Sequence, residues 1–186
     1  MGYFNILEMT RVYGIKKLIY ASSSSVYGEQ TKFPLNEKLL LNPKNTYALS
    51  KLFDERLSDI YANTYNLKII GMRFFTVFGE WGRPDMFMMK YLKSVFFNKK
   101  FELFNYGNHF RDFTYIGDVV NILYKLLRKN NTQKHMVFNV CSNKPIKITK
   151  VINIIDTFVG KKAIIKLLPM QRADIKKTHG NNDLIK

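Results

Sequence analysis

The stretch KLIYASSSSVYG, residues 17–28, joins a short apolar run to a polar loop. The apolar run covers residues 17–21, four serines from Ser22 to Ser25 close it, and Tyr27 and Gly28 follow. A short apolar run bounded by polar residues is typical of a buried strand in a parallel sheet. The stretch therefore predicts a strand that delivers a polar loop at its carboxyl end.

Helices and strands alternate on both sides of this stretch. Gly14 is placed to end the first helix, Asn45 or Thr46 to cap the second, and Pro84 to occupy the first turn of the third. The predicted elements are a helix over 2–13, a strand over 17–21, a helix over about 46–66, a strand over 67–75, a helix over 84–98, a strand over 101–104, a helix over 116–128, a strand over 136–140, a helix over 149–159 and a strand over 163–168. This alternation predicts an α/β fold with a mostly parallel sheet between helices, because parallel strands need crossover connections.

Composition excludes several classes of protein. The chain has 186 residues, of which 46% are apolar, so it can bury one core but is too short for two comfortable domains. It has no apolar run near the roughly 18 residues of a membrane span. Its single cysteine, Cys141, and three dispersed histidines exclude a disulfide scaffold and predict no metal site. The first ten residues lack a secretion signal, so we expect a cytoplasmic protein.

The net charge of +16 raises the question of a nucleic-acid partner. The lysines, however, occur as scattered pairs such as Lys16-Lys17 and Lys99-Lys100, mostly at the edges of apolar segments. That pattern favours solvated faces, and we expect no nucleic-acid partner. A basic binding module without catalysis remains an alternative interpretation.

Tyr47 and Lys51 lie four residues apart on a predicted helix and are therefore neighbours on one face. An ammonium group beside a phenol favours the phenolate and makes the tyrosine a candidate general base. A nearby serine would position the reacting hydroxyl. The pair alone is weak, because a half-exposed helix face gives the same pattern.

The order of the parts is far more specific than any one of them. Segments 21–28 (ASSSSVYG), 47–51 (YALSK) and 73–79 (RFFTVFG) follow each other in this order, and the downstream segments 82–86, 105–107, 111–116 and 118–119 add to the pattern. Together they resemble the extended short-chain dehydrogenase/reductase family, the NAD-dependent nucleotide-sugar epimerases and dehydratases. The resemblance covers essentially the whole chain. It implies a partial Rossmann-like sheet over 1–80, the later half of a NAD-binding domain, and a mainly substrate-binding lobe with returning Rossmann elements over 81–186.

The resemblance also implies catalytic and cofactor-binding roles. Tyr47 corresponds to the base that takes the proton of the sugar 4-hydroxyl, and Lys51 to its electrostatic partner and a ribose ligand. Ser23 or Ser24 corresponds to the serine partner. Ala21 falls among the cofactor-binding positions.

Four further residues correspond to positions that contact cofactor or substrate. Phe74 falls on the nicotinamide side, Thr76 and Arg83 at the sugar, and Arg111 at the nucleotide diphosphate. Each has a structural alternative: Phe74 as core, Thr76 as a strand end, and the arginines as surface cations, although a guanidinium suits carboxylate and phosphate.

The subclass rests on the residues next to the serines. Dehydratases and decarboxylases of the family carry a carboxylate there, whereas residues 22–25 are all serine and the first acid is Glu29. This favours simple epimerisation through a 4-keto sugar. The run RFFTVFGEWGRPDM, residues 73–86, looks most like UDP-glucuronate 4-epimerases, with a dehydratase or reductase of the same family as the alternative.

A glycine-rich turn for the NAD pyrophosphate is missing. The nearest candidate, residues 79–82, has Asp85 in place of a third glycine. We therefore expect a fragment of an enzyme whose intact form is a homodimer, held in relatives by helices that match 2–13 and 46–66. Strand 17–21 would lack its neighbour, so we expect an unstable or aggregation-prone chain that binds NAD weakly and shows no turnover alone.

Overall fold

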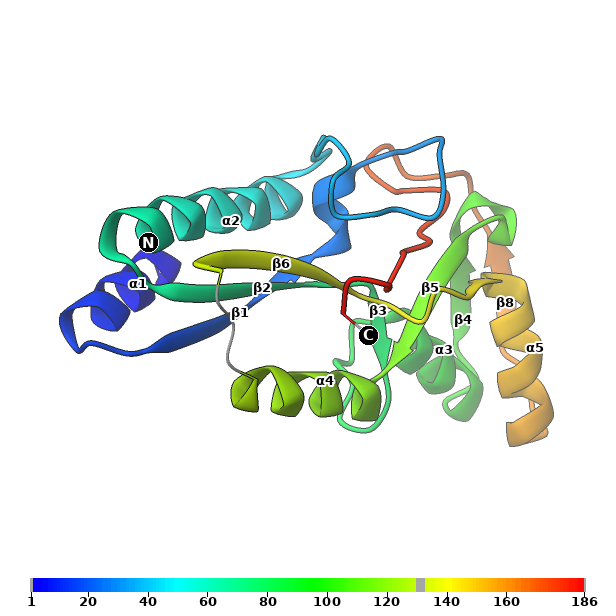
Figure 1. The fold of residues 1–186 in the computed structure, drawn as a ribbon. Helices are drawn as coiled ribbons and strands as arrows, with labels where there is room; N and C mark the ends of the chain where they lie inside the picture. The colour runs from blue at the N-terminus through cyan, green and yellow to red at the C-terminus, as the bar shows by residue number, and fades with distance from the viewer. Residues whose placement is uncertain (1, 130–132, 186) are drawn as a thin grey trace.

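The computed structural model describes residues 2–129 and 133–185, and its centre is a parallel sheet of three strands. These are β1 (Lys17–Ser23), β2 (Lys68–Phe74) and β6 (His135–Val140), in the order β1-β2-β6. Helices α1 (Gly2–Val12) and α2 (Thr46–Tyr65) cover one face, and α4 (Ile116–Arg128) covers the other (Figure 1). The predicted α/β class and Rossmann-like sheet are confirmed.

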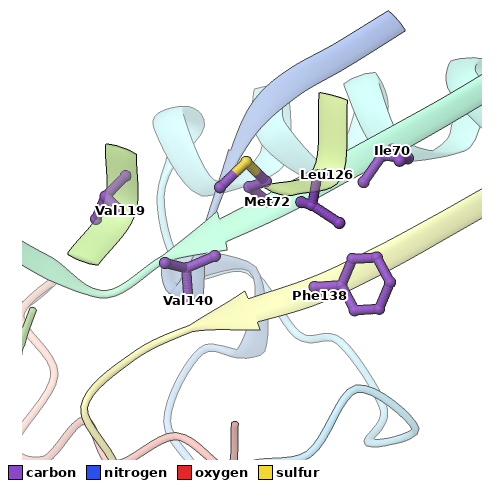
Figure 2. Close-up of a cluster of buried hydrophobic side chains, with 6 residues drawn as sticks. All are labelled: Ile70, Met72, Val119, Leu126, Phe138 and Val140. Atoms are coloured by element: carbon purple, nitrogen blue, oxygen red, sulfur yellow. The ribbon is translucent and has the colours of Figure 1, made fainter. Parts of the chain in front are cut away.

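Alternation along β2 divides the apolar core between the two faces of the sheet. Ile69 packs with Leu7 of α1 and Ala62 of α2. Ile70 and Met72 point to the opposite face, as successive strand residues must. Figure 2 shows that face, where side chains of α4, β2 and β6 form one cluster: Ile70, Met72, Val119, Leu126, Phe138 and Val140.

The remaining strands form two small sheets to one side of the central one (Figure 1). The first has the order β3-β5-β7, with β3 parallel and β7 antiparallel to β5, and the second pairs β4 with β8 in parallel. Their bounds are β3 (Thr76–Phe78), β4 (Lys100–Leu103), β5 (Phe110–Tyr115), β7 (Pro145–Lys147) and β8 (Ile164–Leu167). Helices α3 (Phe87–Phe96) and α5 (Ile148–Val159) pack on β4 through Tyr91, Phe101 and Ile152.

The list of predicted strands is wrong for this side of the molecule, because it lacks β3, β5 and β7. Strands β3 and β7 have only three residues each, too few to show a period, and β5 lies in a stretch read as a motif rather than as a strand. The predicted start of the third helix is also wrong. Pro84 lies in a turn closed by the Met86 N–H donating to the Arg83 carbonyl at 3.1 Å, and α3 begins only at Phe87.

Two termini of predicted helices are confirmed with their caps. Asn45 caps α2, since its Oδ1 accepts from the Ala48 N–H at 2.8 Å. Gly14 follows α1 with a φ of +61°, a conformation that glycine adopts without strain. Among the described helices, none is both long enough and apolar enough to cross a membrane.

Candidate functional site

The carboxyl ends of β1 and β2 bring predicted site residues from two segments together. Ser23, the last residue of β1, pairs in register with Phe74, the last residue of β2. Ala21 lies two positions earlier on β1. In open α/β sheets, ligands bind at the carboxyl ends of the strands, where these residues lie.

Helix α2 adds Tyr47 and Lys51 to the same end of β1. The Lys51 Nζ donates to the Ala21 carbonyl at 3.0 Å and lies 3.4 Å from the Asp54 Oδ2. Tyr47 is one turn earlier on the same face of α2, and 55% of it is exposed. The helix face that Tyr47 shares with Lys51 therefore lies at this end of the sheet.

The serine run separates into structural and available hydroxyls. Ser22 is buried and donates to the Glu55 Oε1 at 2.6 Å, so its hydroxyl has a structural role inside the protein. Ser23 caps the short helix η1 (Ser24–Tyr27), and its Oγ accepts from the N–H and hydroxyl of Ser25 at 3.2 and 2.9 Å. Among the described residues, no acceptor takes the proton of the Ser23 hydroxyl. Ser24 is partly buried at the start of η1.

A buried ion pair lies directly beneath this group. The Arg73 Nε and Nη2 donate to the two Glu55 carboxylate oxygens at 2.8 and 2.7 Å, and both side chains are 5% exposed. Tyr27 accepts from Arg73 at 2.8 Å and donates to Asn139 at 2.7 Å. Burial alone would lower the pKa of Arg73, but its bonds to Glu55 and Tyr27 raise that pKa above its ordinary value. The network ties α2 to β1, β2 and β6.

Sequence reasoning placed no weight on Glu55, although a signal was present. Arg73 interrupts an apolar strand, and a charge on a buried strand requires a partner. Glu55 lies one turn after Lys51, on the helix that faces this strand.

A cavity of about 380 Å³ opens between α3, β4, β5 and the segment near residue 174. Thr76 and Arg111, two of the predicted substrate contacts, both line it. The Arg111 Nη2 donates to the Asp174 Oδ1 at 2.8 Å, and burial lowers the pKa of the guanidinium from its ordinary value. The cavity also contains His109, which sequence reasoning missed because an isolated histidine carries no pattern.

Arg83 lies elsewhere, on the loop between β3 and α3. Its Nη2 pairs with the Asp85 Oδ2 at 3.1 Å, and both side chains are largely exposed. It lines a second, mostly apolar cavity of about 170 Å³, which Thr76 also borders. Thr76 therefore lines both cavities, and neither of these two cavities, as lined by the described residues, contains both arginines.

Phe74 connects the two groups of candidate residues. It is half-buried against the α4-side core, so it has a packing role in addition to its place at the strand end. One residue, Phe75, separates it from Thr76. The strand-end group and the cavity group thus adjoin along the chain.

The sequence pattern of the NAD dependent epimerase/dehydratase family matches residues 1–141. The chain belongs to this family. An uncharacterized protein of Methanocaldococcus jannaschii is 42% identical over 97% of this chain and 55% of its own length. A UDP-glucuronate 4-epimerase of Thermodesulfobacterium geofontis is 37% identical over 95% of this chain and 54% of its own length.

A solved structure agrees with these sequence relatives. The UDP-glucuronic acid 4-epimerase of Bacillus cereus, in complex with UDP-glucuronic acid and NAD, is 30% identical and superposes with a TM-score of 0.92. The match covers 98% of this chain and 58% of that one. The chain therefore spans little more than half the length of these epimerase/dehydratase relatives.

The residues of this family member fit one end of the family's NAD. Lys51, Ala21 and Ser23 place an ammonium group, a carbonyl and a hydroxyl together at the end of the sheet. Gly79, by contrast, does not provide a phosphate cradle, because a Cβ there would lie 2.4 Å from the Ile116 Cγ2. Its lack of a side chain serves packing against α4, so the described residues supply no pyrophosphate turn.

Proposed function

We propose that this chain forms the catalytic and substrate-binding part of an NAD-dependent nucleotide-sugar epimerase, a UDP-glucuronate 4-epimerase. The observation that carries the proposal is the bond from Lys51 to Ala21, which fixes the helix face of Tyr47 at the carboxyl end of β1. In this scheme residues 1–80 belong to the NAD-binding domain and residues 81–186 mainly to the substrate lobe. The family membership and the 37% identity to a UDP-glucuronate 4-epimerase support it.

Tyr47 is the proposed general base. Its phenolate takes the proton of the sugar 4-hydroxyl and returns it when the sugar is reduced again. Lys51 stabilises the phenolate electrostatically and is held by the Ala21 carbonyl and Asp54. Ser23 donates its free hydroxyl proton to the reacting oxygen, and Ser24 is the alternative donor.

NAD, when bound, supplies the acceptor and then the donor of the hydride at sugar C4. Lys51 would hold the nicotinamide ribose, Ala21 would line the same end of the cofactor, and Phe74 would border the nicotinamide. These contacts orient the cofactor beside Tyr47.

In this proposal, the two cavities bind different parts of the substrate. Arg111 binds the diphosphate of the UDP-sugar, because a guanidinium matches phosphate oxygens in charge and shape. Thr76 and Arg83 contact the sugar, where a cation suits a uronic acid carboxylate. We place the intact enzyme in the cytoplasm as a homodimer that packs α1 and α2 against their counterparts.

The surroundings of Ser23 favour epimerisation over dehydration. Elimination needs an additional acid or base at the reacting carbons, and residues 22–25 offer only hydroxyls. The first carboxylate beyond them, Glu29, lies 3.8 Å from the Lys44 ammonium group and is part of an ion pair.

A chimera tests the proposal. The part of the Thermodesulfobacterium geofontis enzyme that precedes the matching region would be fused before residue 1 and supplied with NAD and UDP-glucuronate. We expect UDP-galacturonate from the chimera and no turnover from the 186-residue chain alone. A 4-keto-6-deoxy product from a UDP-hexose would instead identify a dehydratase.

A further inference from the structure

His109 is a buried titratable group in the Arg111 cavity to which the proposed mechanism gives no role. Its side chain is 7% exposed, and its Nε2 lies 3.0 Å from the Asp174 Oδ2. The alignment is too poor for a hydrogen bond, so this buried nitrogen has no hydrogen-bond partner among the described residues. The other Asp174 oxygen accepts from Arg111 at 2.8 Å. One carboxylate thus stands between a guanidinium and an imidazole.

We propose that His109 is a positioning residue that controls, through Asp174, how freely Arg111 binds the diphosphate of a nucleotide sugar. The inference rests on the proposed function, because it takes the cavity as the diphosphate site. It concerns only residues of this chain, and every side chain that it uses lies in the described cavity or directly beside it.

The control works by competition for one carboxylate. While His109 is neutral, Asp174 has a single cationic partner and holds Arg111. A protonated His109 attracts Asp174 from the other side, which weakens its hold on Arg111. The imidazolium also adds a positive charge to a cavity that would receive two phosphate groups. Both effects strengthen diphosphate binding.

Charges around the cavity decide when His109 takes up its proton. Burial lowers the pKa of His109, Arg111 lowers it further, and Asp174 opposes both. A bound diphosphate would raise this pKa by adding negative charge nearby. The charged side chains that act on His109 or line its cavity are Arg111, Asp174, Glu29, Lys90, Asp85 and Glu102.

The direction of the pH effect follows by linkage. If the complex binds a proton at His109 that the free protein does not, affinity rises as the pH falls toward the pKa of the histidine. Each unit by which the ligand raises that pKa permits up to about a tenfold gain in affinity.

The experiment is calorimetric titration of the 186-residue chain with UDP-glucose at about pH 5.5 and about pH 8. UDP-glucose is a suitable probe because its doubly esterified diphosphate does not titrate in this interval. We expect roughly three- to tenfold tighter binding at the lower pH. His109→Gln should bind with nearly equal affinity at both values. His179→Gln is the matched control and should retain the wild-type difference, since His179 bonds to Asn143 outside the cavity.

Proton NMR of the wild-type chain gives a second readout that does not depend on measured affinities. The chain has only three histidines, so their ring signals can be assigned by substitution. Saturating UDP-glucose should raise the pKa of His109 and leave that of His179 unchanged.

The outcomes separate this inference from the proposed function. Binding of equal strength at both pH values, or an unchanged pH effect in His109→Gln, overturns the role of His109 and leaves the diphosphate site standing. Absence of UDP-glucose binding at both pH values overturns this inference together with the assignment of the cavity.

Discussion

Residues 47, 51, 55 and 59 form one stripe along α2, and the two halves of this stripe contact the sheet in opposite ways. In the first half, Lys51 bonds to the backbone of β1 at the Ala21 carbonyl, and Tyr47 is 55% exposed. Glu55 and Asp59 in the second half contact the side chains of Arg73 on β2 and His135 on β6. Each step of four residues advances about 40° around the helix, so one stripe crosses successive strands.

The difference between the halves agrees with the proposed division of the stripe into an anchoring part and a catalytic part. The Glu55 carboxylate accepts from Ser22 and Arg73, so its hydrogen-bonding capacity is used inside the protein. No hydrogen bond from another side chain occupies the Tyr47 hydroxyl among the described residues, which leaves it available to a substrate. Stability and activity should therefore respond to different halves of the same stripe.

Glu55→Ala should cause the largest loss of stability among the variants of the stripe. It leaves the Arg73 guanidinium buried without its carboxylate, and removal of one partner of a buried pair costs about 3–5 kcal/mol. Guanidinium chloride denaturation would measure the loss. Glu102→Ala is the control, because Glu102 pairs with Lys166 at 3.5 Å on the surface and should change stability by less than about 1 kcal/mol. Equal losses in both variants would show that the Glu55 pair does not anchor α2.

Tyr47→Phe should leave stability nearly unchanged and should greatly reduce activity. The free energy of unfolding should stay within about 0.5 kcal/mol of wild type, because the hydroxyl is on an exposed residue. Epimerisation by the chimera should fall by at least about 100-fold, the usual contribution of a general base. Product formation from UDP-glucuronate would measure it. A phenylalanine variant with near-wild-type turnover would remove Tyr47 from the proposed mechanism.

Sequence reasoning predicted the central sheet and α2 because their sequence patterns are long enough to be recognised. KIIGMRF is a continuous buried strand, and Asn45 is a helix cap of a preferred type. The three-residue strands β3 and β7 have no detectable period, and pairing partners distant along the chain decide where they form. Pro84 misled the prediction because proline suits a turn before a helix as well as its first turn.

The candidate site was predictable only where residues near in sequence carry the chemistry. Tyr47 and Lys51 are one helical turn apart, so their spacing is visible. Asp174 meets Arg111 and His109 across more than sixty residues, a contact that exists only in the folded chain. Sequence reasoning therefore predicted Arg111 by resemblance and missed the two side chains that surround it.

Asn45→Ala should destabilise the first turn of α2, which carries the first half of the stripe, and leave the second half unchanged. Loss of an asparagine cap costs about 1 kcal/mol and frees the turn that carries Tyr47. Urea denaturation would measure the loss. Asn63→Ala near the other end of α2 is the matched control: its amide donates to Asp59 on the exposed surface, and we expect a change within about 0.5 kcal/mol. A larger loss at Asn63 would reverse the proposed importance of the two ends.

The pH dependence of stability should depend weakly on His135, which contacts the second half of the stripe. His135 lies 3.4 Å from Asp59 and 3.2 Å from the Tyr20 hydroxyl. Burial lowers the pKa of His135 below its ordinary value of 6.5, and Asp59 opposes this shift without cancelling it. The unfolded chain therefore binds a proton at His135 before the folded chain does, and stability falls as the pH drops from about 6.5 toward the lowered folded pKa. Stability curves at several pH values should fall less steeply for His135→Gln than for wild type. A steeper fall in the variant would mean that Asp59 holds a charged His135, and the second half of the stripe would then be anchored by two ion pairs instead of one.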